Sequence, residues 1–247
     1  MAITVGTAGW GIPRDIAAEF PGDETNLERY ARVFDGVEIN TSFQRAHRRE
    51  TYEKWANSVG ASFRFAVKIP RAITHEARLG GVEKTLDAFL EQVGALGAKL
   101  GPLLVQFPPS FAFDARLFGS FCSRIRERGR YLVACEPRHP SWFETWVDQW
   151  LADRKIARVA ADPALHPGAG TPGGWRGLAY YRLHGAPRVY FSAYDRATLA
   201  DLEEKLARQP TDTAWCVFDN TASGAAAADA LILKAGLANR SARPASR

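Results

Sequence analysis

Short apolar runs alternate along the chain with longer stretches in which apolar residues recur every three or four positions. The short runs have the length and residue types of buried strands, and the longer stretches place their apolar residues on one helical face. We predict strands at residues 3–10, 36–43, 63–70, 101–109, 131–139, 157–164, 178–185 and 214–220. Eight strands that alternate with helices over about 250 residues are typical of a TIM-type (β/α)8 barrel. The pattern therefore predicts an α/β barrel of a single domain.

Capping residues mark where two of the helices begin. Thr25 is followed by Glu28, and Ser141 by Glu144, at the spacing of a capping box. One connection differs, because residues 164–177 are too rich in Gly and Pro to hold a helix. We therefore expect a Gly/Pro-rich loop in place of the sixth helix.

A doubly wound open sheet is the alternative to the barrel. Its phosphate-binding fingerprint requires a set spacing of glycines, which the stretch "GTAGWG" does not have. The chain shows no internal repeat and no linker that would divide it. We place one domain in residues 1–237 and expect a basic, disordered tail in residues 238–247.

Charge bears on the choice of partner. The formal net charge is +5, and the predicted tail contributes Arg240, Arg243 and Arg247 to it. Without these three the chain carries +2, which is only mildly basic. Proteins that grip duplex DNA usually present a strongly basic face, so nucleic acid is a weakly supported partner.

The cysteine spacing and the hydropathy pattern indicate a protein with reduced cysteines and no membrane span. The three cysteines, Cys122, Cys135 and Cys216, have no CxxC spacing. The N-terminal residues enter a strand without the pattern of a signal peptide. No run approaches the roughly 18 apolar residues of a membrane span. We expect a cytoplasmic protein with no membrane contact, and the oligomeric state is left open.

Polar side chains collect at the carboxyl ends of the predicted strands. In residues 36–43, Glu38 and Asn40 share one face, and Val37 and Ile39 occupy the other. The same alternation places polar residues on the inward faces of five further strands: Lys68, Gln106, Glu136, Arg138, Asp162, Arg182 and His184. Because the active sites of barrels form at these strand ends, we predict one shared polar pocket.

Ion pairs within a barrel are the structural alternative for these charges. Glu38 could neutralise Lys68, and Glu136 could neutralise Arg182. Charges removed from water are costly unless they are fully paired, so purely structural cores tend to avoid them. We therefore favour a functional pocket.

Seven motifs follow one another between about residues 5 and 235: "GTAGW", "VEINTSF", "FAVKIPRAITH", "LGPLLVQFPPSF", "EPRHPSWF", "YYRLHG" and "VFDN". In this order they resemble the YecE-like proteins, domain-of-unknown-function family 72. The resemblance implies a TIM-type barrel and reinforces the pocket residues, while the family name records that no activity is established. The chain departs from the family pattern at Pro137, where an aromatic residue is expected, and at Asp219, where Asn is expected before Asn220. Asp219 adds a carboxylate at the rim of the pocket.

Two roles are assigned to the residues of the pocket. The expected catalytic residues are Glu38, Glu136, Lys68, His184 and Asp162, since two carboxylates in different environments can divide general acid and general base work. The residues expected to bind substrate are Asn40, His75, Gln106, Arg138, His139, Arg182, Asn220 and Trp10. Lysine and arginine suit an anion, and arginine can grip phosphate or carboxylate with two hydrogen bonds.

An enzyme that acts on a small phosphate- or carboxylate-bearing substrate is the favoured function, with hydrolysis as its most natural subclass. One alternative adds a divalent metal, in the manner of a barrel phosphodiesterase or isomerase, held by Glu38, Glu136 and Asp162 with His184 or His139. Another is a non-catalytic module that binds an anion or nucleic acid. A Schiff base on Lys68 would require a lowered pKa, of which the sequence gives no sign.

Overall fold

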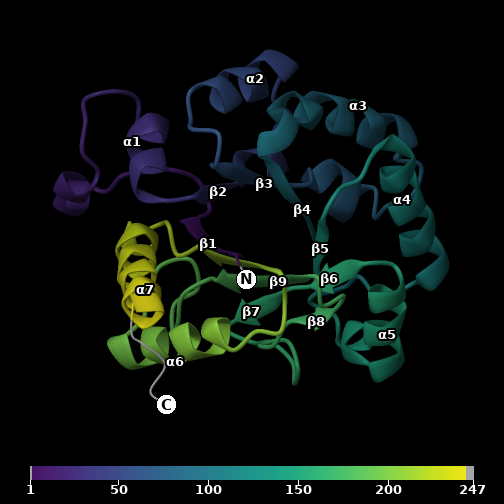
Figure 1. Cartoon of the computed structure of the whole chain (residues 1–247). Helices are drawn as coiled ribbons and strands as arrows, with labels where there is room; N and C mark the ends of the chain where they lie inside the picture. The colour runs from purple at the N-terminus through teal and green to yellow at the C-terminus, as the bar shows by residue number, and fades with distance from the viewer. Residues whose placement is uncertain (1, 243–247) are drawn as a thin grey trace.

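The computed structural model describes residues 2–242 and has an α/β architecture, in which helices follow one another around a set of strands (Figure 1). The strands are β1 (Ala2–Thr7), β2 (Gly36–Ile39), β3 (Arg64–Lys68), β4 (Leu100–Gln106), β5 (Val133–Glu136), β6 (Ile156–Arg158), β7 (Ala160–Asp162), β8 (Gly173–Gly174), β9 (Leu178–Leu183) and β10 (Thr213–Phe218). The α-helices are α1 (Asn26–Val33), α2 (Arg49–Asn57), α3 (Glu83–Val93), α4 (Ala115–Arg128), α5 (Thr145–Asp153), α6 (Arg196–Ala207) and α7 (Ala225–Ala242). Each predicted strand coincides with at least one observed strand.

The strands pair in two sheets. One has the order β1-β10-β9-β7 and the other the order β2-β3-β4-β5-β6-β8, with β8 antiparallel to β6 and the other neighbouring strands parallel. A parallel bridge between Ala8 and Glu38 joins β1 to β2. A Cβ atom on Gly6 would lie 2.2 Å from the carbonyl oxygen of Gly36, so this close approach of β1 and β2 requires glycine.

The predicted sixth strand is divided between the two sheets. β6 pairs with β5, and β7 pairs with β9, while Val159 lies between them and donates its N–H to the carbonyl oxygen of Cys135 at 2.8 Å. Between β7 and β9 the structure contains turns and the two-residue strand β8, with no helix in this described segment. The expected loop in place of the sixth helix is therefore confirmed.

Two apolar clusters lie on opposite faces of the strands. The larger one packs the helices onto the sheets and includes the strand residues Val37, Ile39 and Val105. The smaller one consists of inward-facing residues: Ala66, Leu104, Ala134, Ala157, Val159, Leu178, Tyr180, Trp215 and Val217. The expected alternation is thus confirmed for β2 to β5 and for β9. It is wrong for the sixth strand, where Val159 faces inward and Ala160 packs on the helix side.

Local signals at the helix ends have mixed outcomes. The capping box of Thr25 and Glu28 begins α1 as predicted. The predicted box of Ser141 and Glu144 is wrong, because the hydroxyl of Ser141 accepts from the N–H of Phe113 and α5 begins at Thr145 without a side-chain cap. No helix within residues 2–242 is long and apolar enough to cross a membrane.

The prediction of a disordered tail is wrong for residues 238–242. Helix α7 runs to Ala242, so these residues are helical. Residues 243–247 lie outside the described residues, and the rest of the prediction for the tail falls on them.

Candidate functional site

Arg182, near the end of β9, lies at the centre of a buried charge cluster. Its guanidinium is fully buried and donates to Glu38 twice, with Nη2–Oε1 and Nε–Oε2 distances of 2.8 and 3.1 Å. It also donates to Oε2 of Glu136 at 2.7 Å and to Oδ2 of Asp219 at 2.9 Å. One cation therefore holds three buried carboxylates from three different strand ends, as a planar guanidinium with five donors can do.

His184 joins two of these carboxylates on a second side. Its Nε2 lies 2.9 Å from Oε1 of Glu136, and its Nδ1 lies 3.0 Å from Oδ2 of Asp219. Burial lowers the pKa of His184, but the carboxylates of Glu136 and Asp219 outweigh it, and the net result is a raised pKa. Both ring nitrogens then act as donors, so the site favours the imidazolium form.

The same charges act on the carboxyl groups. Burial by itself would raise the pKa of Glu136, but Arg182 and His184 hold it well below the usual range. Burial also acts to raise the pKa of Asp219, but Arg182 and His184 outweigh it, and the net result is a lowered pKa. Both groups are therefore carboxylates at neutral pH. The hydrogen bonds that they accept from Arg182 and His184 stabilise this charged form.

Neutral donors also bind two of the carboxylate oxygens that Arg182 contacts. Tyr180 donates its hydroxyl to Oε2 of Glu38 at 2.8 Å, and Gln106 donates its amide to Oε2 of Glu136 at 3.0 Å. Arg182 thus contacts both of the glutamates that we expected to be catalytic, and their catalytic role stays a prediction.

Lys68, the last residue of β3, has a different environment from Arg182. Its side chain is 5% exposed, and Nζ lies 4.0 Å from the centre of the Phe43 ring. Among the described residues, no carboxylate oxygen lies within 4.0 Å of the ammonium of Lys68, so it has no ion-pair partner there. Burial and then Arg182 lower the pKa of Lys68 to about 8, against the opposing effect of the carboxylates.

His75 contacts the same aromatic ring as Lys68. Its ring is 5.0 Å from that of Phe43 at an angle of 82°, and its Nδ1 is 2.9 Å from the hydroxyl of Thr74. Burial, Lys68 and then Arg138 lower its pKa to about 4. His75 is therefore a neutral imidazole at neutral pH.

Arg138 forms the accessible edge of the cluster. Its Nη2 lies 3.4 Å from Oε1 of Glu136 and donates to the hydroxyl of Tyr190 at 3.2 Å. A small cavity of about 100 Å³ opens here, lined by Glu136, Pro137, Arg138, Ala161, Pro163, Leu165, Ala169, His184 and Val189. The cavity thus has a charged wall from the strand ends and an apolar wall from the two loops after β7 and β9.

Three of the predicted site residues lie away from this cluster. Asp162 accepts the hydroxyl of Tyr194 at 2.8 Å, because the sixth strand has the opposite alternation to the one we predicted. His139 caps the turn at 140–143 by accepting the N–H of Ser141. Trp10 packs edge-on against Trp55, with ring centres 5.0 Å apart.

The two asparagines at strand ends have other surroundings. Asn220 is fully buried and donates its amide to Oδ2 of Asp229 and to the carbonyl oxygen of Ser192, so it ties the loop after β9 to α7. Oδ1 of Asn40 and Oδ1 of Asn220 are buried without a hydrogen-bond partner among the residues described. Each keeps an acceptor that a donor could use.

Four contributors to the site were missed or misplaced by the sequence reasoning. Asp219 was expected at the rim but is buried between Arg182 and His184. Phe43, Tyr180 and Tyr190 were not predicted. The alternation along residues 178–185 already put Tyr180 on the inward face with Arg182, whereas no local signal marks Phe43 or Tyr190.

The residues expected to hold a metal come together only in part. Glu38, Glu136 and His184 lie in one cluster, in which both glutamates are bound to Arg182, whereas Asp162 and His139 lie elsewhere. Over residues 2–242, no group of three or more His, Cys, Asp or Glu side chains has an arrangement suited to a metal ion. The donor set that we expected therefore does not fit a divalent metal.

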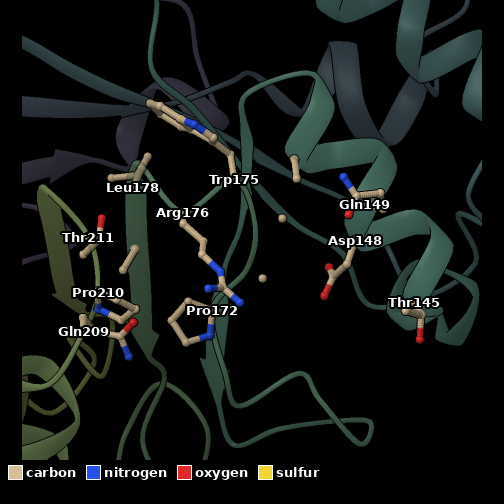
Figure 2. Close-up of a pocket in the computed structure, with 14 residues that line it drawn as sticks. Thr145, Asp148, Gln149, Pro172, Trp175, Arg176, Leu178, Gln209, Pro210 and Thr211 are labelled. Carbon is tan, nitrogen blue, oxygen red and sulfur yellow. The ribbon is translucent and has the colours of Figure 1, made fainter.

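A larger hollow lies at the opposite, amino ends of the strands. It measures about 590 Å³ between α5, the segment 172–179 and the turn before β10. Figure 2 shows Arg176 reaching into it between Leu178 and Asp148. The carboxylate of Asp148 is already paired with Arg158 at 2.7 Å. None of the predicted site residues lies here, so size alone does not mark the functional site.

Comparison with solved structures establishes the fold. A DUF72 family protein from Thermotoga maritima superimposes with a TM-score of 0.77 and 26% identity, covering 96% of this chain and 100% of the other. D-psicose 3-epimerase from Clostridium cellulolyticum has a TM-score of 0.54 at 11% identity, covering 98% and 97% of the two chains. The α/β fold is therefore close to that of DUF72 proteins and distantly similar to that of a sugar epimerase.

Sequence comparison places the chain in a family. The protein YecE of Escherichia coli is 28% identical over 166 residues, which are 65% of this chain and 59% of the relative. The match thus spans less than two thirds of the curated relative's length. The family model described as "Protein of unknown function DUF72" matches residues 4–247. This chain accordingly belongs to the DUF72 family.

Proposed function

We propose that the protein is an enzyme that carries out proton transfer on a small anionic substrate, bound at the carboxyl ends of the strands. The observation that carries the proposal is the buried ammonium of Lys68, which has no carboxylate partner in residues 2–242 although three carboxylates lie in the same cluster. A structural set of ion pairs would use its carboxylates to neutralise every buried cation. Here Arg182 pairs with all three carboxylates, and Lys68 has no carboxylate partner in the described part of the chain.

The charges of the cluster support an anionic ligand. Its carboxylates are Glu38, Glu136 and Asp219, and its cations are Lys68, Arg138, Arg182 and protonated His184. With all four cations charged the cluster has one positive charge in excess. An anion would balance it, and Arg138, which is only partly buried, is placed to hold a phosphate or carboxylate.

Proton transfer is better supported than hydrolysis. Hydrolysis by the expected carboxylate pair would need one of them to activate a water molecule, and both Glu38 and Glu136 are occupied by Arg182. Lys68, with a pKa of about 8, is close to the value that suits a general acid or base near neutral pH. His184 can hold or release a proton at the cavity wall. These two side chains therefore replace the carboxylates as our candidates for catalysis.

We also propose that the strands close into a TIM-type barrel. The bridge between Ala8 and Glu38 joins one edge of the two sheets, and the divided sixth strand spans the other edge. The distant similarity to a sugar epimerase supports the same arrangement. In such a barrel the Arg182 cluster lies at the end where active sites form.

Calorimetric titration with inorganic phosphate tests the anion site. We expect Arg138→Gln to weaken phosphate binding by about tenfold or more, because a charge-assisted hydrogen bond contributes about 1.5–3 kcal/mol. The matched control is Arg176→Gln in the other hollow, which should leave binding unchanged. Equal weakening by both variants, or no phosphate binding by the parent protein, would contradict the proposal.

Turnover separates an enzyme from a binding module. The protein is incubated with a panel of sugar phosphates and small keto acids in deuterated water, and proton NMR follows exchange and product formation. We expect exchange of a carbon-bound proton in at least one compound, and its loss in Lys68→Met. Phosphate binding without exchange or product across the panel would favour the non-catalytic alternative.

A further inference from the structure

We propose that Lys68 acts as a nucleophile and forms an imine with a carbonyl compound that carries an anionic group. This inference rests on the function proposed above and specifies its substrate class. The sequence alone supplied no reason to prefer it, and the surroundings of Lys68 in the structure do.

The backbone holds Lys68 at a defined place. Ser42 donates its hydroxyl to the carbonyl oxygen of Lys68 at 2.6 Å and also to that of Ile39 at 2.9 Å, so the ends of β2 and β3 are fastened together. The turn that contains Ser42 also carries Phe43, whose ring contacts the ammonium. The side chain is thus positioned by two neighbouring strand ends.

The environment makes the neutral amine of Lys68 more accessible than that of an ordinary lysine. A lysine that only attracts an anion keeps its charge best when water solvates it. Lys68 is instead buried against an aromatic ring, and the positive charge of Arg182 disfavours its protonation. Burial and a neighbouring cation are the two conditions that activate a lysine as a nucleophile, because they release its lone pair at neutral pH. The pKa of about 8 agrees with this geometry.

The covalent step can be written with atoms and charges in balance. The neutral nitrogen of Lys68 attacks the carbonyl carbon, a C–N bond forms, and the carbonyl oxygen takes one of the nitrogen's protons to give a carbinolamine. A second proton, which the imidazolium of His184 can supply, then allows the oxygen to leave as water and gives the protonated imine. The imine withdraws electrons from the adjacent carbon, so a proton on that carbon becomes easier to remove.

The cavity defines the rest of the substrate. Its volume of about 100 Å³ suits a small molecule, and Arg138 and His184 lie on its charged wall. In this proposal the cations on that wall hold the anionic group of the substrate. Lys68 does not itself line the cavity, so the carbonyl group has to extend from the cavity into the charge cluster to reach it. Both a phosphorylated ketone and a keto acid have this chemistry, and the test distinguishes them.

The experiment is reductive trapping. The full chain is incubated with dihydroxyacetone phosphate or with pyruvate, in each case with sodium cyanoborohydride, and the product is analysed by intact mass and by peptide mapping. We expect one adduct per chain on Lys68, with a mass gain equal to that of the carbonyl compound less one oxygen atom. The compound that gives the adduct identifies the anionic group as phosphate or carboxylate.

Variants decide whether the adduct is specific. Lys68→Arg should abolish it, and Lys84→Arg, on the exposed surface of α3, should leave it unchanged. Peptide mapping of the parent protein locates the modified lysine even if a variant fails to fold. No adduct with either compound, or adducts spread over several lysines including Lys84, would overturn the inference. If phosphate binding and proton exchange persist without an adduct, the imine alone is refuted; if all three fail, the proposed function fails with it.

Discussion

The two ends of the strands use charge in different ways. At the amino ends, the larger hollow contains Asp148, which is neutralised by Arg158, and the exposed Arg176 (Figure 2). At the carboxyl ends, a cavity about one sixth as large lies against a cluster in which Arg182 is fully buried. In this comparison, buried charge rather than open volume distinguishes our candidate site.

Within the carboxyl-end cluster there is a second contrast. Arg182 is surrounded by three carboxylates, while Lys68 faces an aromatic ring. In the first arrangement every charge has a partner, so that removing the cation would be costly. The second costs stability, because the ammonium of Lys68 is buried without a carboxylate partner among residues 2–242. Residues that cost stability in this way are the ones for which function is the natural explanation.

The largest expected effect comes from breaking the paired arrangement. Arg182→Met leaves three buried carboxylates without their cation, and we expect the free energy of unfolding to fall by about 3–5 kcal/mol. Urea denaturation followed by circular dichroism measures the change. The matched control, Arg176→Met at the amino ends, should stay within about 0.5 kcal/mol of the parent. A similar loss in both variants would remove the contrast between the two ends.

Removing the charge of Lys68 should have the opposite effect on stability from removing that of Arg182. We expect Lys68→Met to be more stable than the parent at pH 7 by about 3 kcal/mol, since the pKa of Lys68 falls from 10.5 to about 8 on folding. The folded parent binds fewer protons than the unfolded chain between these values. Its free energy of unfolding should therefore rise with pH from about 8 to 10.5 relative to the variant, and the advantage of Lys68→Met should disappear.

Denaturation of the parent and of Lys68→Met at a series of pH values measures this difference. Subtracting one curve from the other removes the contribution of groups that the two proteins share. Lys84→Met serves as the exposed control and should show no comparable gain. A destabilised Lys68→Met would mean that the ammonium has a partner that stabilises it, and the argument for an unpaired cation would be wrong.

A smaller effect should sharpen the role of Asp219. Asp219→Asn removes one of the two carboxylates that raise the pKa of His184, and restores the residue that the family pattern leads one to expect. We expect the pKa of His184 to fall, because one of the two neighbouring opposite charges is lost. NMR titration of the imidazole Cε1 proton reads this directly.

His75 provides the internal control in the same spectra. Because its pKa is lowered to about 4 by burial, Lys68 and Arg138, it should remain neutral above pH 5 in the parent and in Asp219→Asn. An unchanged pKa of His184 would show that Glu136 alone sets it. A shift of both histidines would point to a wider rearrangement of the cluster.

Sequence reasoning succeeded where the signal was local. The apolar runs located the strands, the alternation along β2 and β9 placed Glu38 and Arg182 on the inward face, and the glycines of residues 164–177 excluded a helix. It failed where two segments far apart compete for one group. Ser141 has the spacing of a capping box with Glu144, but the backbone N–H of Phe113 uses its hydroxyl.

The failure at Asp162 has a different cause. Ala157 and Val159 both face inward, so the alternation continues unbroken where the chain passes from one sheet to the other. Our prediction places the polar side chain of Asp162 on the inward face, and the structure gives the opposite phase, with Ala160 on the helix side.

The sequence by itself determined which residue types would meet at the strand ends, because the period of a strand and the position of its polar residues are local properties. Only the tertiary structure decided how the charges are shared among them. A guanidinium has five donors and can bind any of the nearby carboxylates, so the partners of Arg182 depend on where four strand ends stand in space. That choice also decided that Lys68 would be left without a carboxylate, and with it which residue we propose for the chemistry.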